Sequence, residues 1–297
     1  MIVDKIKKLK EEKNAIILAH NYQPPEIQDI ADLCGDSLEL SIKAAATTAD
    51  IILFCGVKFM AETASILSPD KTILLPNQDA GCPMADMITP DALAKKIKTF
   101  AGIPVVTYVN STAAVKALTT ICCTSANVVD VVNSLDSDEI LMTPDKNLAQ
   151  YAASKTNKKI HLWEGYCPFH NNLKVEDVKK AQKVHPDAVF MAHPECPPEI
   201  LEMADKITST SGMIKYAQKS DNKEFIVGTE IGLLYPLQNI CPDKKFYPAS
   251  LSMECLDMKK ISLSDVEKSL EFLYGQVKVP EDIRKPALKA VQRMIDI

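Results

Sequence analysis

The heptapeptide FMAHPEC, Phe190 to Cys196, is a short apolar run that ends in a histidine, a proline, a glutamate and a cysteine. ILAHNYQ, Ile17 to Gln23, has the same form, because its apolar run is also followed by Ala-His and polar groups. A third run of this kind is VVTYVNS, Val105 to Ser111. Short apolar runs with polar ends predict buried strands, so we expect chemically active side chains at the ends of three such strands.

These three segments align the chain with itself. When His20, Tyr108 and His193 share a column, the spacings are 88 and 85 residues, and the alignment continues without a gap for more than thirty residues. Three hydroxyl-bearing residues then coincide 17 positions later: Ser37, Ser125 and Thr210, here called the hydroxyl column. Gly56, Pro144 and Thr229 follow 19 positions beyond those and close three further strand-like runs.

If the alignment allows a small change in the length of the repeats, three of the nine cysteines also coincide. They are Cys82, Cys167 and Cys255, here called the cysteine column. Hydroxyls and cysteines that fall in one register indicate a threefold internal repeat. The apolar columns of this alignment, such as Leu18, Val106 and Met191, are interpreted as core. The columns that place histidine, hydroxyl and cysteine at strand ends indicate a shared site.

Each repeat reads as alternating helices and strands, for the first near residues 4–13, 15–19, 26–47, 51–55, 57–67 and 72–76. This alternation predicts a parallel sheet covered by helices on both faces, with ligands bound beyond the carboxyl ends of the strands. The predicted fold class is α/β, with three pseudo-threefold-related three-layer αβα repeats around a central site. The expected repeats span residues 1–86, 87–171 and 172–258, and a helical segment, 259–297, follows them.

Composition narrows the function classes. Hydrophobic residues make up 46% of the 297 positions and charged residues 25%, and the net charge of −5 is spread along the chain, which argues against a nucleic-acid partner. No apolar run approaches the roughly 20 residues of a membrane span, and the charged N-terminal stretch does not read as a signal peptide. The odd number of cysteines does not suggest a secreted disulfide framework, so a cytoplasmic protein is expected.

The cysteine column suggests a metal centre. None of its members belongs to a C-x-x-C pair, so a zinc ribbon or a ferredoxin-type site is a poor match. If the fold brings them to one axis, three thiolates can hold a cubane iron-sulfur cluster whose fourth iron stays open as a Lewis acid. The alternative is a closed zinc site in which His170, three residues after Cys167, is the fourth ligand. The other six cysteines show no threefold pattern and are predicted to be core residues.

The hydroxyl column is predicted to lie where helices begin. Its members can cap separate helices, or they can line one pocket that binds a small polyanionic substrate. The strand ends supply the triplets His20-Asn21-Tyr22, Tyr108-Val109-Asn110 and His193-Pro194-Glu195. Such side chains are either structural or serve to transfer protons and fix carbonyl groups.

The chain resembles the quinolinate synthase (quinolinate synthetase A) family over nearly its whole length. The motifs are AHNYQ, DIADLCGDSLEL, YVNSTA, TSAN, GYCPFH, AHPEC, STSGM and GTEIG. The resemblance implies three pseudo-symmetric α/β domains around a 4Fe-4S cluster held by the cysteine column. It also implies a transferase of NAD biosynthesis, which condenses iminoaspartate (iminosuccinate) with dihydroxyacetone phosphate to give quinolinate, phosphate and water without net oxidation. A functional link to the enzyme that supplies iminoaspartate is expected, with no nucleic-acid or membrane partner.

The same resemblance implies roles for single residues. The expected substrate-binding positions are His20, Ser37, Tyr108, Val109, Asn110, Ser125, His193, Pro194, Glu195 and Thr210. Glu195 and Tyr22 are the expected proton carriers, and the other catalytic candidates are His20, Tyr108, His193 and His170. Some relatives have a histidine where this chain has Tyr166, so a proton role at that position does not transfer. Two other functions stay open at this point, a cluster-binding redox sensor or scaffold and an aconitase-like hydro-lyase.

Overall fold

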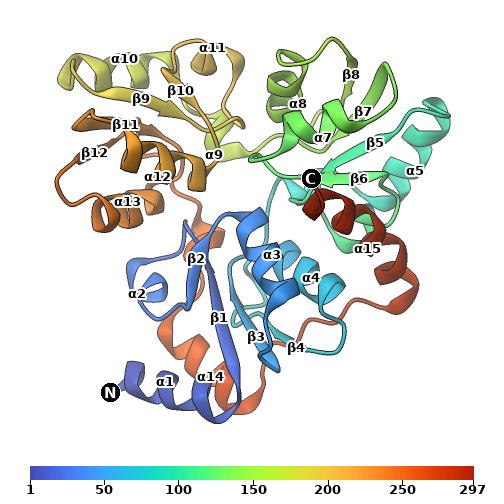
Figure 1. The fold of residues 1–297 in the computed structure, drawn as a ribbon, viewed down its shortest axis with the longest axis vertical. Helices are drawn as coiled ribbons and strands as arrows, with labels where there is room; N and C mark the ends of the chain where they lie inside the picture. The colour runs from blue at the N-terminus through green and yellow to red at the C-terminus, as the bar shows by residue number, and fades with distance from the viewer.

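The computed structural model describes residues 1–297 and contains three four-stranded parallel sheets that surround a common centre (Figure 1). The strand orders are β2-β1-β3-β4, β6-β5-β7-β8 and β10-β9-β11-β12, so the second sheet repeats the order of the first, and so does the third. The strands of the first sheet are β1 (Ala15–His20), β2 (Leu33–Gly35), β3 (Ile51–Cys55) and β4 (Thr72–Leu74). Its helices are α1 (Ile2–Glu12), α2 (Pro25–Gln28), α3 (Ser37–Ala46) and α4 (Lys58–Leu67).

The second and third repeats follow the same plan. The second contains β5 (Val105–Tyr108), β6 (Ile121–Cys123), β7 (Glu139–Thr143), β8 (Lys159–Leu162), α5 (Pro90–Thr99), α6 (Ala113–Lys116), α7 (Val128–Ser134) and α8 (Lys146–Ala153). The third contains β9 (Val189–Ala192), β10 (Lys206–Ile207), β11 (Glu224–Gly228), β12 (Lys245–Pro248), α10 (Val175–Val184), α11 (Pro198–Leu201), α12 (Thr210–Lys219) and α13 (Leu234–Ile240). The short elements are η1 (Ala85–Met87), α9 (Pro168–Asn171), η2 (Ile231–Leu233) and η3 (Leu256–Lys259).

The strand register confirms the internal alignment. One inner strand of each sheet, β1, β5 or β9, has a fully buried apolar residue at the same place: Leu18, Val106 and Met191. Each pairs on one side with the residue 15 positions later, and these partners are Leu33, Ile121 and Lys206. On the other side each pairs with the residue 36 positions later, and these partners are Phe54, Met142 and Val227. Equal spacings in all three sheets mean that equivalent residues of the repeats occupy equivalent places.

The prediction of one helix over residues 26–47 is wrong. Two helices, α2 and α3, flank a three-residue strand, β2, that pairs in parallel with β1. Pro25 begins α2 at a position that needs no backbone donor, and the side chain of Asp36 caps α3 by accepting the N–H groups of Leu38 and Glu39. Each sheet therefore has four strands where three were expected, because a strand of three residues has no periodicity to detect.

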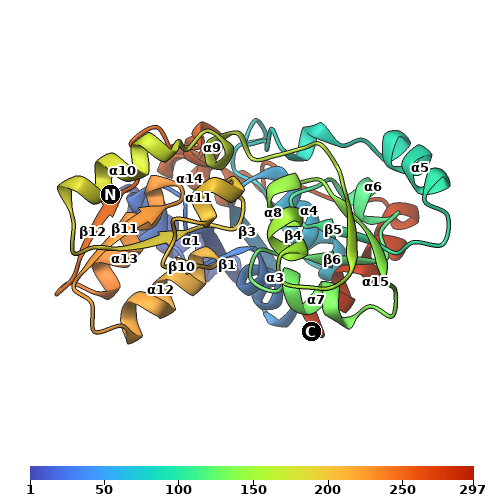
Figure 2. The same ribbon diagram turned by 90° about the horizontal axis from the view of Figure 1, so that it is seen from above.

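The C-terminal helices pack on the first two repeats. Helix α14 (Leu263–Phe272) lies beside α1, where Lys5 makes ion pairs with Glu267 and Glu271 (Figures 1 and 2). Helix α15 (Glu281–Ile295) lies against α6 and β6, and its buried side chains recur at helical spacing: Ala287, Ala290, Val291 and Met294. None of the helices combines the length and the apolar character that crossing a bilayer requires.

Candidate active site

The three repeats meet at a central cavity of about 70 Å³. It lies beyond the carboxyl ends of β1, β5 and β9, because His20, Tyr108 and His193 line it together. Of the fifteen site residues expected from the sequence, thirteen line this cavity. The two that do not are Val109, which lines a smaller neighbouring pocket, and Pro194.

The hydroxyl column lines the cavity, but its members are not the helix caps. Ser37 and Thr210 are the first residues of α3 and α12, and the caps are the residues before them, Asp36 and Ser209. Ser125 lies two residues before Asn127, the residue that precedes α7. Because Asp36 and Ser209 cap α3 and α12, the hydroxyls of Ser37 and Thr210 are not needed as caps and line the cavity.

Two column hydroxyls bond to side chains from another repeat. Thr210 Oγ1 accepts a hydrogen bond of 3.0 Å from Asn21 Nδ2, and Ser125 Oγ lies 3.1 Å from His193 Nε2. The caps also join across repeats, because Ser209 Oγ donates to Asp36 Oδ2 at 3.0 Å. The start of α3 and the start of α12 are therefore fixed to each other beside the cavity.

The two strand-end histidines are oriented alike. His20 Nδ1 accepts the N–H of Tyr22 at 3.2 Å, and His193 Nδ1 accepts the N–H of Glu195 at 3.4 Å. An acceptor at Nδ1 places the proton of a neutral imidazole on Nε2, so in both rings Nε2–H is the donor that remains. Burial lowers the pKa of both histidines to about 3, which keeps them neutral at physiological pH.

The three cysteines of the column line the same cavity, each at or just before a short helix. Cys167 and Cys255 occupy the N-cap positions of α9 and η3, and Cys82 lies three residues before η1. Burial raises the pKa of the thiols, to about 12 for Cys82 and about 11 for Cys255, and nearby backbone N–H groups oppose this. A positively charged centre would reverse the effect of burial and bind all three as thiolates.

The remaining cysteines lie outside the cavity, and all nine are free thiols. Five of the six are buried, as expected for core residues: Cys55, Cys122, Cys123, Cys196 and Cys241. Cys34 is only partly buried, so it is not a fully buried core residue as was predicted.

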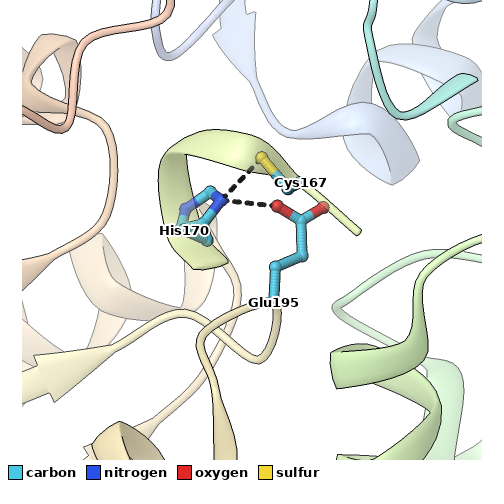
Figure 3. Close-up of side chains that lie close together, drawn as sticks. All are labelled: Cys167, His170 and Glu195. Atoms are coloured by element: carbon cyan, nitrogen blue, oxygen red, sulfur yellow. Dashed lines mark hydrogen bonds and ion pairs between the residues drawn. The ribbon is translucent and has the colours of Figure 1, made fainter. Parts of the chain in front are cut away.

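A continuous chain of hydrogen bonds crosses the cavity wall. Tyr22 Oη lies 2.5 Å from Thr229 Oγ1, and Thr229 Oγ1 lies 2.8 Å from His170 Nε2. On the other side of the imidazole, His170 Nδ1 lies 2.6 Å from Glu195 Oε2 and 3.2 Å from Cys167 Sγ (Figure 3). The chain joins a tyrosine of the first repeat to a glutamate of the third. Sequence reasoning placed Thr229 in a column but assigned it no function.

The titratable groups in and beside this chain of hydrogen bonds differ in their preferred charge. Burial opposes ionisation of Glu195, but the adjacent His170 and a hydrogen bond from Tyr108 outweigh it and hold the pKa of the carboxyl below its ordinary value. Burial and the negative charge of Glu195 raise the pKa values of Tyr22 and Tyr108 well above the ordinary value of a tyrosine. The glutamate is thus an ionised acceptor of protons, and both phenols are protonated donors.

Cys167, His170 and Glu195 also form a group that can hold a metal ion, since their ligand atoms all lie within 4.8 Å of one another. Figure 3 shows the three side chains pointing at one another: His170 comes from α9, Cys167 from the residue just before that helix, and Glu195 from the loop after β9. The 2.6 Å between His170 Nδ1 and Glu195 Oε2 is that of a hydrogen bond. Two ligands of one tetrahedral zinc ion would lie about 3.3 Å apart.

Comparisons with known proteins give one consistent result. A family model described as "Quinolinate synthetase A protein" matches residues 4–296. The chain is 55% identical to the quinolinate synthase of Geobacter sp. (strain M21), over 98% of this chain and 96% of that protein. It is 53% identical to the quinolinate synthases of Geobacter metallireducens and Methanosarcina barkeri, over 100% of this chain and 97% of each relative.

Proposed function

The chain belongs to the quinolinate synthetase A family, which serves NAD biosynthesis, and from this premise we propose that it condenses iminoaspartate with dihydroxyacetone phosphate to give quinolinate, phosphate and water. One observation supports this most strongly: a single cavity brings together the cysteine column, the hydroxyl column and the two ends of the hydrogen-bonded chain, Tyr22 and Glu195. Anion binding, proton transfer and metal binding are thereby available at one place.

The proposed cofactor is a 4Fe-4S cluster held by Cys82, Cys167 and Cys255. The thiols fit it, because all three line one cavity, no fourth cysteine does, and backbone N–H groups near each sulfur favour its thiolate form. When bound, the cluster supplies one iron without a cysteine ligand as a Lewis acid for a substrate oxygen. The zinc alternative needs His170 as a ligand, but both nitrogens of that ring are hydrogen-bonded, to Thr229 and to Glu195.

The proposed substrate groups are held by polar side chains from all three repeats. The hydroxyl column and the Nε2–H of His20 offer donors to carboxylate and phosphate oxygens. The first N–H groups of α3 and α12 add partial positive charge beside the cavity. Asn110 lines the cavity and its Oδ1 is buried without a partner, so it offers an acceptor to a substrate N–H or O–H.

Proton transfer is assigned to Glu195 and Tyr22. Ring closure requires protons to be taken from carbon and given to departing hydroxyl groups. The ionised Glu195 takes the proton, and the protonated Tyr22 gives one. Thr229 and His170 join the two groups, so a proton accepted at Glu195 Oε2 can be returned to Tyr22 Oη through hydrogen bonds. Tyr108, bonded to the same carboxylate, orients it or acts as a second donor.

Two other functions are separable by experiment. A redox sensor or scaffold needs a cluster but no turnover and no lined anion pocket, and an aconitase-like hydro-lyase would dehydrate a hydroxy acid without forming a carbon–carbon bond. The hydroxyl column on the cavity wall favours an enzyme over a sensor. We place the enzyme in the cytoplasm, where nine free thiols stay reduced, and expect the enzyme that makes iminoaspartate to act next to it.

The test is anaerobic purification followed by an absorption spectrum, an iron count and a turnover assay. Dihydroxyacetone phosphate is supplied together with iminoaspartate generated in the assay, and quinolinate and phosphate are measured. One quinolinate for each phosphate, formed by a brown protein with about four irons, supports the proposal. A brown protein without quinolinate favours the sensor or the hydro-lyase, and a colourless protein that cannot be reconstituted refutes the cofactor.

A further inference from the structure

Three equivalent backbone hydrogen bonds tie the start of a helix to the loop that holds a column cysteine. The N–H of Lys58 donates to Ala80 at 2.9 Å, that of Lys146 donates to Gly165 at 2.8 Å, and that of Ile231 donates to Met253 at 2.9 Å. Each acceptor lies two residues before a column cysteine. The residues before the three donors therefore occupy equivalent places, and they are Val57, Asp145 and Glu230.

At two of these places an oxygen of a buried carboxyl group accepts a hydrogen bond from the main chain of the cysteine. Asp145 Oδ2 accepts the N–H of Cys167 at 3.1 Å, and Asp145 Oδ1 accepts the N–H of Leu148 at 2.8 Å and so caps α8. Its side chain is buried, with 1% of the residue exposed, and the exchange of water for two fixed N–H donors is what makes this burial tolerable.

Glu230 makes the equivalent contact in the third repeat. Its Oε1 accepts the N–H of Cys255 at 3.1 Å, and its Oε2 accepts the N–H of Gly232 at 2.7 Å. Lys259 Nζ lies 2.9 Å from Oε1 and supplies the opposite charge. The longer side chain of Glu230 thus reaches the cysteine N–H that is equivalent to the one bonded by Asp145 in the second repeat.

The first repeat lacks this hydrogen bond between a carboxyl group and the N–H of the cysteine. Val57 is buried, with 1% exposed, and its side chain offers no acceptor for the N–H of Cys82. Two of the three cysteines are thus held by a carboxylate and one is not, although the backbone bonds around all three are the same.

We propose that Asp145 and Glu230 are positioning residues that fix Cys167 and Cys255 for binding the cluster. A hydrogen bond to the cysteine N–H holds the main chain from which the thiol projects, so less order has to be gained when the metal centre binds. This inference rests on the cofactor proposed above, and it concerns how firmly the protein retains the cluster.

The test compares Asp145→Asn and Glu230→Gln with a matched control, Asp36→Asn. Asp36 is also a buried helix-capping aspartate beside the cavity, but it contacts no column cysteine. Each amide keeps one acceptor oxygen and puts an NH2 group against the second donor, so one N–H bond is lost. Two quantities are measured under anaerobic conditions: the rate at which a ferrous chelator removes iron, and the urea midpoint of the cluster-free protein.

We expect iron to leave Asp145→Asn and Glu230→Gln about 10- to 100-fold faster than it leaves the parent, the range typical for loss of a group that orients a metal ligand. Asp36→Asn should lower the urea midpoint by a similar amount but release iron at the parental rate. Conservative Glu230→Asp, which keeps the carboxylate, should recover part of the retention if the acceptor is what matters.

Parental release rates in both variants overturn the inference, and so does an equal acceleration in Asp36→Asn, which would show only a loss of general stability. If Asp145→Asn does not fold, Glu230→Gln decides the question, because Glu230 caps only the three-residue η2 and the ammonium group of its other partner, Lys259, is on a partly exposed side chain. If the parent itself retains no iron, the proposed cofactor fails, and that result is distinct from a failure of the positioning roles.

Discussion

Replacing Glu195 by Gln changes the charge at the centre of the cavity with little change in shape. The carboxylate is buried, with Oε2 2.6 Å from His170 Nδ1 and a further hydrogen bond from Tyr108. Glutamine has the same volume and keeps one acceptor oxygen, but it cannot accept a proton. The substitution therefore separates proton transfer from packing.

The expected loss follows from the protonation states in the cavity. Because its neighbours hold the pKa of Glu195 below its ordinary value, the group is ionised and ready to act as a base at neutral pH. Removal of a positioned base costs roughly a factor of 10² to 10⁴ in rate, or about 3 to 5 kcal/mol of barrier. The hydroxyl column and His20 are unchanged, so the Michaelis constants should move by less than about tenfold.

The assay measures quinolinate formation under anaerobic conditions at saturating concentrations of both substrates, together with the iron content of each protein. Glu39→Gln is the matched control, because Glu39 is a half-buried carboxylate bonded to Ser211 and Lys215 that does not line the cavity. Its turnover should equal that of the parent. If Glu195→Gln makes quinolinate at more than about a tenth of the parental rate, Glu195 is not the essential proton carrier.

Four further outcomes are expected. Alanine in place of any member of the cysteine column should abolish retained iron, whereas Cys241→Ala should not, and equal iron contents would contradict the ligand assignment. Thr229→Val keeps the shape of the side chain but removes the hydrogen bonds to Tyr22 and His170. We expect kcat to fall by roughly 10²-fold or more, with a smaller change in KM. An unchanged kcat would show that protons take another path. Alanine at each member of the hydroxyl column should raise KM for the anionic substrates. The free energy of unfolding should fall by less than the roughly 1 kcal/mol of a lost cap, because Asp36 and Ser209 cap α3 and α12 and Ser125 is not the residue that precedes α7. The reverse pattern would refute a common anion pocket. Burial lowers the pKa of His193 to about 3, so between about pH 3 and 6.5 the unfolded chain binds a proton at this imidazole that the folded chain does not. The free energy of unfolding should therefore fall with falling pH, by about 1 kcal/mol per pH unit for this group. In His193→Asn, the pH dependence measured by urea unfolding at pH 5 and 6 should be smaller by that amount, and an unchanged pH dependence would contradict the reasoning.

The repeat, its register and most of the cavity lining could be predicted from the sequence. Apolar strand cores and the polar residues that end them are local patterns, and three copies of one pattern at nearly constant spacing identify equivalent positions without coordinates. The equal pairing distances in the three sheets confirm this. Parallel strands then bring their carboxyl ends together, which is why the cysteine column and the hydroxyl column line one cavity.

Only the tertiary structure decided which side chain does what at these positions. The strand β2 was hidden inside a predicted helix, because three residues carry no period, and the capping roles passed from the hydroxyl column to Asp36 and Ser209. Thr229 became a link in a hydrogen-bonded chain through contacts with two residues 207 and 59 positions away.

The same holds for Asp145 and Glu230. In the sequence they directly follow Pro144 and Thr229, which share a column of the alignment, but their side chains differ in length and nothing local links them to the cysteines 22 and 25 positions later. Their common role appears when the fold places each carboxylate against the N–H of a cysteine. A local pattern can identify the elements and their order, whereas hydrogen bonds between distant segments depend on distances of a few tenths of an ångström that only the packed chain sets.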